Sequence, residues 1–284
     1  MKLAFSALGV PDLPVPEVLR LASAHGYHGV ELRADGPDEP VRPRGPGRPG
    51  PGPAERADLA ARSSAAGVEV LGLAASTEVA APGADEAVIG AIHALTAQAA
   101  ALGAPFLRVL PGGLPGTPGA EDAVVRRLTA VAPHAAGLGV RVLLETHGDY
   151  GTGAAVARVL DRVGHPGAGA VWDVRRTWLD GEQPHASCAA LAPHLGYVRV
   201  GDFASAEDRA PLALGAGVLP LTECVEVLSR RGWEGWLCWT YEGPRPATDT
   251  APGAAGTVPS VPEPLPRLLG AGRDHLARLL NESA

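Results

Sequence analysis

Short apolar runs alternate with amphipathic stretches along the whole chain. The runs have the length and continuous hydrophobicity of strands covered on both faces. They fall at residues 3–8, 29–33, 68–73, 106–110, 140–145, 169–173, 197–201 and 235–241. Between them, apolar side chains recur every three to four residues, which is typical of helices with one buried face. This alternation predicts a parallel sheet covered by helices.

Glycine marks the ends of several predicted helices. Gly26, Gly67, Gly103, Gly139 and Gly232 each follow a helical stretch and precede an apolar run. A residue in the left-handed conformation commonly ends a helix at this position. We count eight strands and eight helices, and eight strands suggest a closed sheet. The expected fold is therefore α/β: a (β/α)8 TIM barrel with eight parallel strands and an outer ring of helices.

We expect a single domain, 1–284. The chain has 284 residues and is 46% hydrophobic, which suffices for one large core of this type. Two Pro- and Gly-rich insertions, at about 36–53 and 243–266, are predicted to be loops. The first follows the second strand, at the rim where barrel active sites form, so it is a candidate lid, although a disordered insertion is the favoured interpretation. A closing helix is expected over 265–281.

Charge and composition exclude several classes of function. The net charge of −7 offers no basic surface for a phosphate backbone, so nucleic acid is not an expected partner. The only lysine is Lys2, which argues against Schiff-base chemistry. Three cysteines without C-x-x-C spacing argue against a disulfide framework and a zinc knuckle. We expect neither a signal peptide nor a membrane partner, and a cytoplasmic location.

Polar residues end most of the predicted strands, where (β/α)8 barrels carry their functional side chains. A single charged residue at a strand end often forms only a salt bridge at the rim. Several that converge on one rim indicate a site more strongly. The candidates are Glu31, Arg33, Arg108, Glu145, His147, Asp173, Arg175, Arg176, Arg199, Asp202, Thr240 and Glu242.

Five segments resemble the sugar phosphate isomerase/epimerase family of the xylose-isomerase-like barrel superfamily. They read LLETHGD at 143–149, VWDV at 171–174, YVRVGD at 197–202, LGAG at 214–217 and GWL at 235–237. The resemblance covers nearly the whole chain and is densest from 140 to 242. It is fairly specific for fold and family but not for substrate. It implies proton transfer next to a carbonyl, with a metal stabilising the enediolate.

The resemblance also implies four metal ligands, of which two are present. Glu145 and Asp173 match the acidic ligands of strands five and six. Arg199 replaces the strand-seven histidine and Thr240 the strand-eight glutamate. A guanidinium has no free lone pair and keeps its proton, so it is not a ligand. Glu242 reaches inward only if its strand shifts or bulges. We expect no cofactor, with Mn, Co, Zn or Mg on Glu145 and Asp173 as the alternative.

Arginines supply positive charge where the ion is missing. Two carboxylates alone in a pocket repel each other, and one takes up a proton. Arg199 or Arg176, which stands at a histidine position of the family, would compensate them. Because a guanidinium binds carboxylate or phosphate through paired hydrogen bonds, we expect a small, anionic substrate.

Roles follow from this chemistry. Glu145 is the candidate base, an arginine would stabilise an enolate, and His147 is an acid/base or orienting group. The residues assigned to catalysis are Glu145, Asp173, Arg199, His147 and Glu242. Those assigned to substrate binding are Glu31, Arg33, Arg108, Arg176 and Thr240.

Three functions remain open. The first is an isomerase or epimerase acting on a small hydroxy-carbonyl compound, which predicts hydrogen exchange at a substrate carbon. The second is a metal-independent lyase, dehydratase or cyclase recruited to a specialised pathway, which predicts inactivity on simple sugars. The third is a noncatalytic ligand-binding barrel, for which Glu145→Gln would change affinity but abolish no turnover. Family members often dimerise, so a homodimer is an expected possibility.

Overall fold

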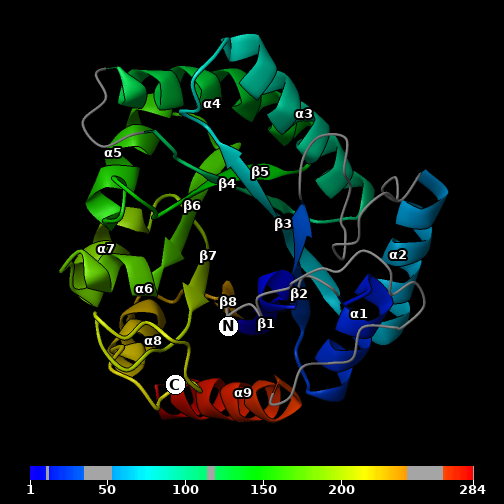
Figure 1. Ribbon diagram of the computed structural model, residues 1–284, viewed down its shortest axis with the longest axis vertical. Helices are drawn as coiled ribbons and strands as arrows, with labels where there is room; N and C mark the ends of the chain where they lie inside the picture. The colour runs from blue at the N-terminus through cyan, green and yellow to red at the C-terminus, as the bar shows by residue number, and fades with distance from the viewer. Residues whose placement is uncertain (11–12, 35–52, 114–118, 242–264, 284) are drawn as a thin grey trace, which may run out of the picture.

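Eight parallel strands form the centre of the computed structural model, which describes residues 1–10, 13–34, 53–113, 119–241 and 265–283 (Figure 1). Each strand pairs with the next, and β8 pairs with β1, so the predicted barrel closes. The strands are β1 (Lys2–Ser6), β2 (Gly29–Ala34), β3 (Glu69–Glu78), β4 (Phe106–Leu110), β5 (Arg141–Glu145), β6 (Ala168–Asp173), β7 (Leu195–Val200) and β8 (Trp236–Trp239).

Helices surround the strands as an outer ring (Figure 1). They are α1 (Val15–Ala24), α2 (Pro53–Ala66), α3 (Asp85–Ala101), α4 (Ala120–Gly137), α5 (Gly153–Val163), α6 (Val174–Leu179), α7 (Pro184–Leu191), α8 (Leu221–Arg230) and α9 (Leu265–Glu282), with a short 3-10 helix, η1 (Ala7–Gly9). The described residues thus contain one α-helix more than the eight expected. The connection from β6 to β7 holds two, α6 and α7, and Gly181 between them has a φ of 78°.

The predicted glycine stops are confirmed. Gly26, Gly67, Gly103, Gly139 and Gly232 have φ angles of 71°, 65°, 69°, 72° and 64°, in the left-handed region. A side chain with a Cβ is disfavoured there, so glycine ends each helix at little cost. The sequence pattern locates these helix ends well, because each glycine cap is followed closely in sequence by the next apolar strand.

Some predicted boundaries were wrong. The first strand ends at Ser6 rather than at residue 8, because η1 begins at Ala7. The third strand runs to Glu78 rather than 73, since Glu78 pairs with Leu110 beyond a register shift. The predicted loops 36–53 and 243–266 lie outside the described residues except at their ends, where Pro53 begins α2 and residues 265–266 begin α9.

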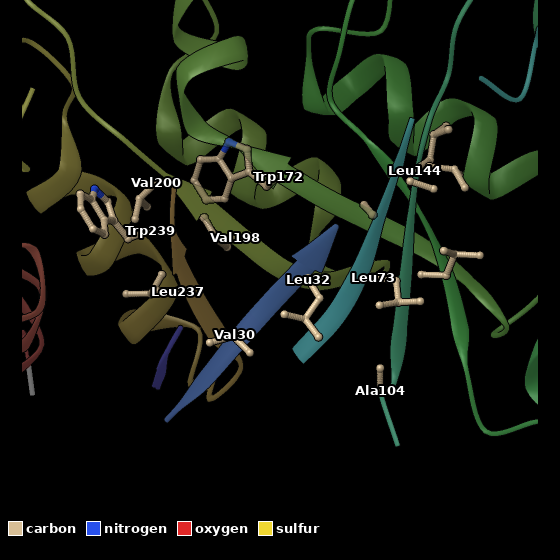
Figure 2. Packing of buried hydrophobic residues seen from close by; sticks show 14 of the residues in the cluster. Val30, Leu32, Leu73, Ala104, Leu144, Trp172, Val198, Val200, Leu237 and Trp239 are labelled. Atoms are coloured by element: carbon tan, nitrogen blue, oxygen red, sulfur yellow. The ribbon is translucent and has the colours of Figure 1, made fainter. Parts of the chain in front are cut away.

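Alternation along the strands separates two buried layers. One face of each strand packs against the helices, and Figure 2 shows Leu32, Leu73 and Leu237 in this outer cluster. The other face points to the barrel axis. The inner cluster consists of Ala4, Leu71, Leu143, Val171, Tyr197, Trp236 and Cys238, with Phe106 packed against it. Since side chains two apart share a face, the next inward position along several strands is polar.

Among the described helices, none has both the length and the apolar character needed to span a bilayer.

One histidine pair predicts acid sensitivity. His93 of α3 packs against His134 of α4, with ring centroids 4.2 Å apart and the ring planes tilted by 41°. Burial, and then the neighbouring His134, lower the pKa of His93 below 6.5. The unfolded chain therefore binds the proton more readily, and stability falls as the pH drops through 6.5. We expect His93→Phe to flatten this dependence in urea titrations at pH 7.5 and 5.5. An unchanged slope, or an equal change in the exposed control His185→Phe, would contradict this origin.

Candidate functional site

Inward-facing polar residues form one layer at the carboxyl ends of the strands. We call them the charged layer. Their exposed fractions run from 0% for Glu31 to 7% for Arg108. Three acids and two bases from different strands are thus buried together at the end of the barrel where catalytic residues lie in this fold. The members are Glu31, Arg108, Glu145, Asp173, Arg199 and Thr240.

The guanidinium of Arg199 lies at the centre of this layer. Its Nη1 donates to Oε1 of Glu145 at 2.9 Å, its Nε donates to Oγ1 of Thr240 at 3.1 Å, and its Nη2 lies 3.6 Å from Oε2 of Glu31. Burial disfavours the charged form. The nearby carboxylates outweigh that effect and hold the pKa of Arg199 well above its ordinary value. The arginine is therefore a permanent buried cation.

Glu145 is held by two cations. In addition to Arg199, the Nε of Arg108 lies 2.6 Å from Oε2 of Glu145. This contact is an ion pair without the angle of a good hydrogen bond, and Nη1 of Arg108 donates to the carbonyl of Ala75 at 2.9 Å. Both carboxylate oxygens of the predicted base thus already face guanidinium groups. Glu145 is also only 2% exposed, so a substrate proton would reach it only if neighbouring side chains moved.

Glu31 accepts two hydrogen bonds from residues that are not among the predicted site residues. The hydroxyls of Ser6 and Tyr197 donate to its carboxylate. Burial raises the pKa of Glu31, but Arg199, Arg108 and these hydrogen bonds prevail, so the pKa is lowered overall. Tyr197 stays a neutral donor because burial, together with Glu31, raises its pKa well above 10. Strand alternation could have indicated Tyr197, which lies two residues before Arg199 on the same face.

Asp173 ends β6 and begins α6. Its Oδ1 accepts from the backbone N–H of Arg175 at 3.0 Å, as in a helix N-cap. The Arg175 side chain returns to the same carboxylate, with Nε 3.1 Å from Oδ1 and Nη2 2.8 Å from Oδ2. Burial opposes ionisation, yet the arginines lower the pKa of Asp173. The sequence pattern predicts Arg175 at the rim but not this pairing, although an acid directly before a helix signals a cap.

The close approach of Arg175 requires a glycine on β7's continuation. A Cβ at Gly201 would lie 2.8 Å from Cδ of Arg175 and 3.0 Å from the carbonyl oxygen of Thr240. We expect Gly201→Ala to lower the free energy of unfolding by about 1–3 kcal/mol, measured in urea, because it overpacks a buried site. The control is Gly90→Ala in α3, where nothing lies within 4 Å. That change should instead stabilise by about 0.4–1 kcal/mol. Equal effects would show that Gly201 is not required by packing.

A second set of candidates lies above the charged layer, at the mouth. His147 is half-buried and held in a tight turn in which its backbone exchanges hydrogen bonds with Tyr150. Burial lowers the pKa of His147 below 6.5, Glu145 opposes the shift, and Arg176 and Arg108 reinforce it. Arg176 is half-buried on α6, and Arg33 shares the inward face of β2 with Glu31. We call His147, Arg176 and Arg33 the mouth residues.

Two other predicted residues fall elsewhere. The carboxylate of Asp202 accepts four backbone N–H groups, from residues 203, 215, 217 and 219, at 2.9–3.2 Å. It therefore shapes the loop between β7 and α8 rather than lining the mouth. Glu242 lies outside the described residues.

The charged layer does not fit a divalent ion. Metal ligands must direct lone pairs at the ion, but a guanidinium of N–H donors lies among the carboxylates of Glu31 and Glu145. Both carboxylate oxygens of Asp173 accept hydrogen bonds from the guanidinium of Arg175. Within the described part of the chain, no three His, Cys, Asp or Glu side chains are grouped so that they would hold a metal.

Comparisons with known proteins agree with this architecture. A family model described as xylose isomerase-like TIM barrel matches residues 19–261. No curated protein matches the sequence. Among solved structures, the probable 3-DHS dehydratase AsbF of Bacillus anthracis has a TM-score of 0.75 at 15% identity, covering 98% of this chain and 99% of that one. D-psicose 3-epimerase of Clostridium cellulolyticum H10 has a TM-score of 0.77 at 14% identity, covering 99% of each chain.

A third structure is that of the IOLI protein with a bound zinc atom. It has a TM-score of 0.75 at 15% identity and covers 100% of this chain and 99% of that one. At these identities the structural likenesses establish the fold alone.

Proposed function

Because the chain belongs to the xylose isomerase-like TIM barrel family, we propose that it is an isomerase- or epimerase-like enzyme. It moves a proton next to a carbonyl of a small, anionic hydroxy-carbonyl compound. One observation carries the proposal. His147, at the mouth of the barrel, is half-buried, and its pKa is lowered by burial and also by the nearby cation Arg176. A neutral imidazole takes up a proton, and a nearby cation binds the anion.

The structure supports a division of roles between the two layers. We assign proton transfer to His147, because its pKa below 6.5 leaves it neutral at pH 7. We assign the substrate anion to Arg176. Within the described residues, no ion pair links Arg176 to a carboxylate. Arg33, also at the mouth, is a second candidate for the anion.

The charged layer acts beneath them. Arg199 is 1% exposed, so its charge stabilises a developing enolate through the field rather than by contact. Glu145 and Asp173 hold the arginines in place, and Glu31, Arg108 and Thr240 complete that network. In this assignment Glu145 is a positioning residue, whereas the family resemblance alone made it the base.

A noncatalytic ligand-binding barrel is the second candidate. The observation that favours it is the engagement of both Glu145 oxygens by guanidinium groups, which is also what purely structural ion pairs would show. A dehydratase or lyase would share the first proton transfer with the proposed reaction and differ in the product.

Deuterium exchange tests the proposal. The protein would be incubated in D₂O with matched compounds: a neutral ketose, the same ketose phosphorylated, and a hydroxy-keto acid. Proton NMR would follow loss of the C–H signal next to the carbonyl. We expect exchange only with an anionic compound. Exchange confined to the neutral ketose would overturn the anionic assignment, and binding without any exchange would favour the noncatalytic barrel. Loss of water would identify a dehydratase.

Arg176→Gln should weaken binding of the anionic compound selected by that screen. Losing one charge-assisted contact is worth about 1.5–3 kcal/mol, which corresponds to a dissociation constant roughly 10- to 100-fold higher. Titration calorimetry would measure it. Arg231→Gln, at an exposed position, is the matched control and should leave affinity unchanged. Unchanged affinity in Arg176→Gln would move the anion site to another residue.

A further inference from the structure

We infer that Arg199 is a built-in cation that occupies the centre of the charged layer in place of a divalent metal ion, and that this chain is therefore metal-independent. The inference concerns ion binding by the barrel centre and stands whether or not the proposed reaction is correct. Three features of the layer carry it.

The first feature is the position of the guanidinium. Glu31 comes from β2 and Glu145 from β5, which are separated by three steps around the barrel. Arg199 reaches in from β7 and spans the space between them, with one nitrogen toward each carboxylate. An ion bridging these acids would need the same space. The long arginine side chain cannot leave easily, since it is 1% exposed and packed among its partners.

The second feature is charge balance. The three carboxylates of the layer, Glu31, Glu145 and Asp173, face its two guanidinium groups, Arg108 and Arg199, and a third from outside it, Arg175 of α6. Buried charges are tolerated when they are paired, and an unpaired charge is costly. A dication added to this set would leave two positive charges uncompensated, so the folded protein disfavours it.

The third feature is Thr240. Its hydroxyl accepts from Nε of Arg199 at 3.1 Å, so a neutral oxygen rather than a carboxylate faces this N–H group. A glutamate at this position would be longer and would add a fourth carboxylate to a balanced set. Arginine at 199 and a short neutral acceptor at 240 thus complement each other in both size and charge. Because the two side chains are in contact, we expect their effects on stability and ion binding to be coupled.

The experiment measures metal binding and needs no substrate. Wild-type protein and the double variant Arg199→His/Thr240→Glu would be expressed with Mn, Co, Zn and Mg supplied. Metal content would be measured by mass spectrometry, and Co²⁺ titrated by visible absorption and by the shift of the melting temperature. The control is Arg231→His/Thr222→Glu, which places the same residue types at exposed positions.

We expect wild type and control to hold well under one ion per chain and to show no Co²⁺-dependent rise in melting temperature. The double variant should bind Co²⁺ at least tenfold more tightly than wild type and melt at a higher temperature when Co²⁺ is present. One tightly held ion per wild-type chain would overturn the inference, as would a double variant that folds without gaining Co²⁺ affinity. If the double variant does not fold, metal content is compared between wild type and Arg199→Lys. Lysine keeps a cation at this position, so both proteins should remain metal-free, and one tightly held ion in either would overturn the inference.

Discussion

Arg199→Met is expected to lower the free energy of unfolding by about 3–5 kcal/mol, the cost of leaving buried carboxylates without their partner. Methionine has a similar length and fills similar space, so the loss of charge dominates the effect. Glu145 and Glu31 would lose the cation that lies 2.9 Å and 3.6 Å away, respectively. Urea unfolding followed by circular dichroism would measure the change.

The control for this prediction is Arg230→Met. Arg230 also pairs with a glutamate, Glu226, at 2.6 Å, but the pair is exposed on one helix. Solvent screening limits such a pair to about 0.3–0.5 kcal/mol. Adding Glu31→Gln to Arg199→Met should recover part of the lost stability, because one uncompensated charge is removed. Similar losses for Arg199→Met and Arg230→Met would show that the charged layer is open to water.

His147→Gln is expected to slow hydrogen exchange of the substrate by roughly 10²- to 10⁴-fold, the usual contribution of a general acid or base. Glutamine keeps the polarity and approximate size of the side chain but cannot take up a proton. Because the pKa of His147 lies below 6.5, the wild-type rate should fall as the pH drops below that value and level off near pH 7. The variant's residual rate should lack this step.

Exchange rates from pH 5 to 8 would be measured by NMR for both proteins, together with melting temperatures. His185→Gln is the matched control, since this histidine is exposed with its Nδ1 3.7 Å from Glu223; it should exchange at the wild-type rate. A rate within twofold of wild type in His147→Gln would return the role of base to Glu145. A lower rate with a lower melting temperature would indicate structural damage instead.

Local patterns in the sequence determined the barrel. Strands that are buried on both faces appear in the sequence as apolar runs, and helices appear as a hydrophobic period of 3.6 residues. Both patterns are local, so they can be recognised without knowing the tertiary structure. Helix ends were equally readable, because Gly26 and Gly139 adopt the backbone angles that their positions require. The carboxyl ends of parallel strands meet at one rim, so the sequence predicts that Glu145, Asp173 and Arg199 lie near one another; in the structure Asp173 and Arg199 are paired in register, and Arg199 contacts Glu145 at 2.9 Å.

The partners within that layer were decided only by the tertiary structure. Glu31 meets Tyr197 across 166 positions in sequence, and Arg199 meets Thr240 across 41. Which arginine pairs with which acid depends on strand stagger, side-chain reach and the balance of buried charge, and none of these has a local signature. Two adjacent arginines illustrate the point: the side chain of Arg175 forms an ion pair with Asp173, whereas its neighbour Arg176 lies at the mouth. The sequence by itself determined which charged groups reach the rim. Only the tertiary structure decided which of them pair with one another, because ion pairs form between residues that are close in space but distant in sequence.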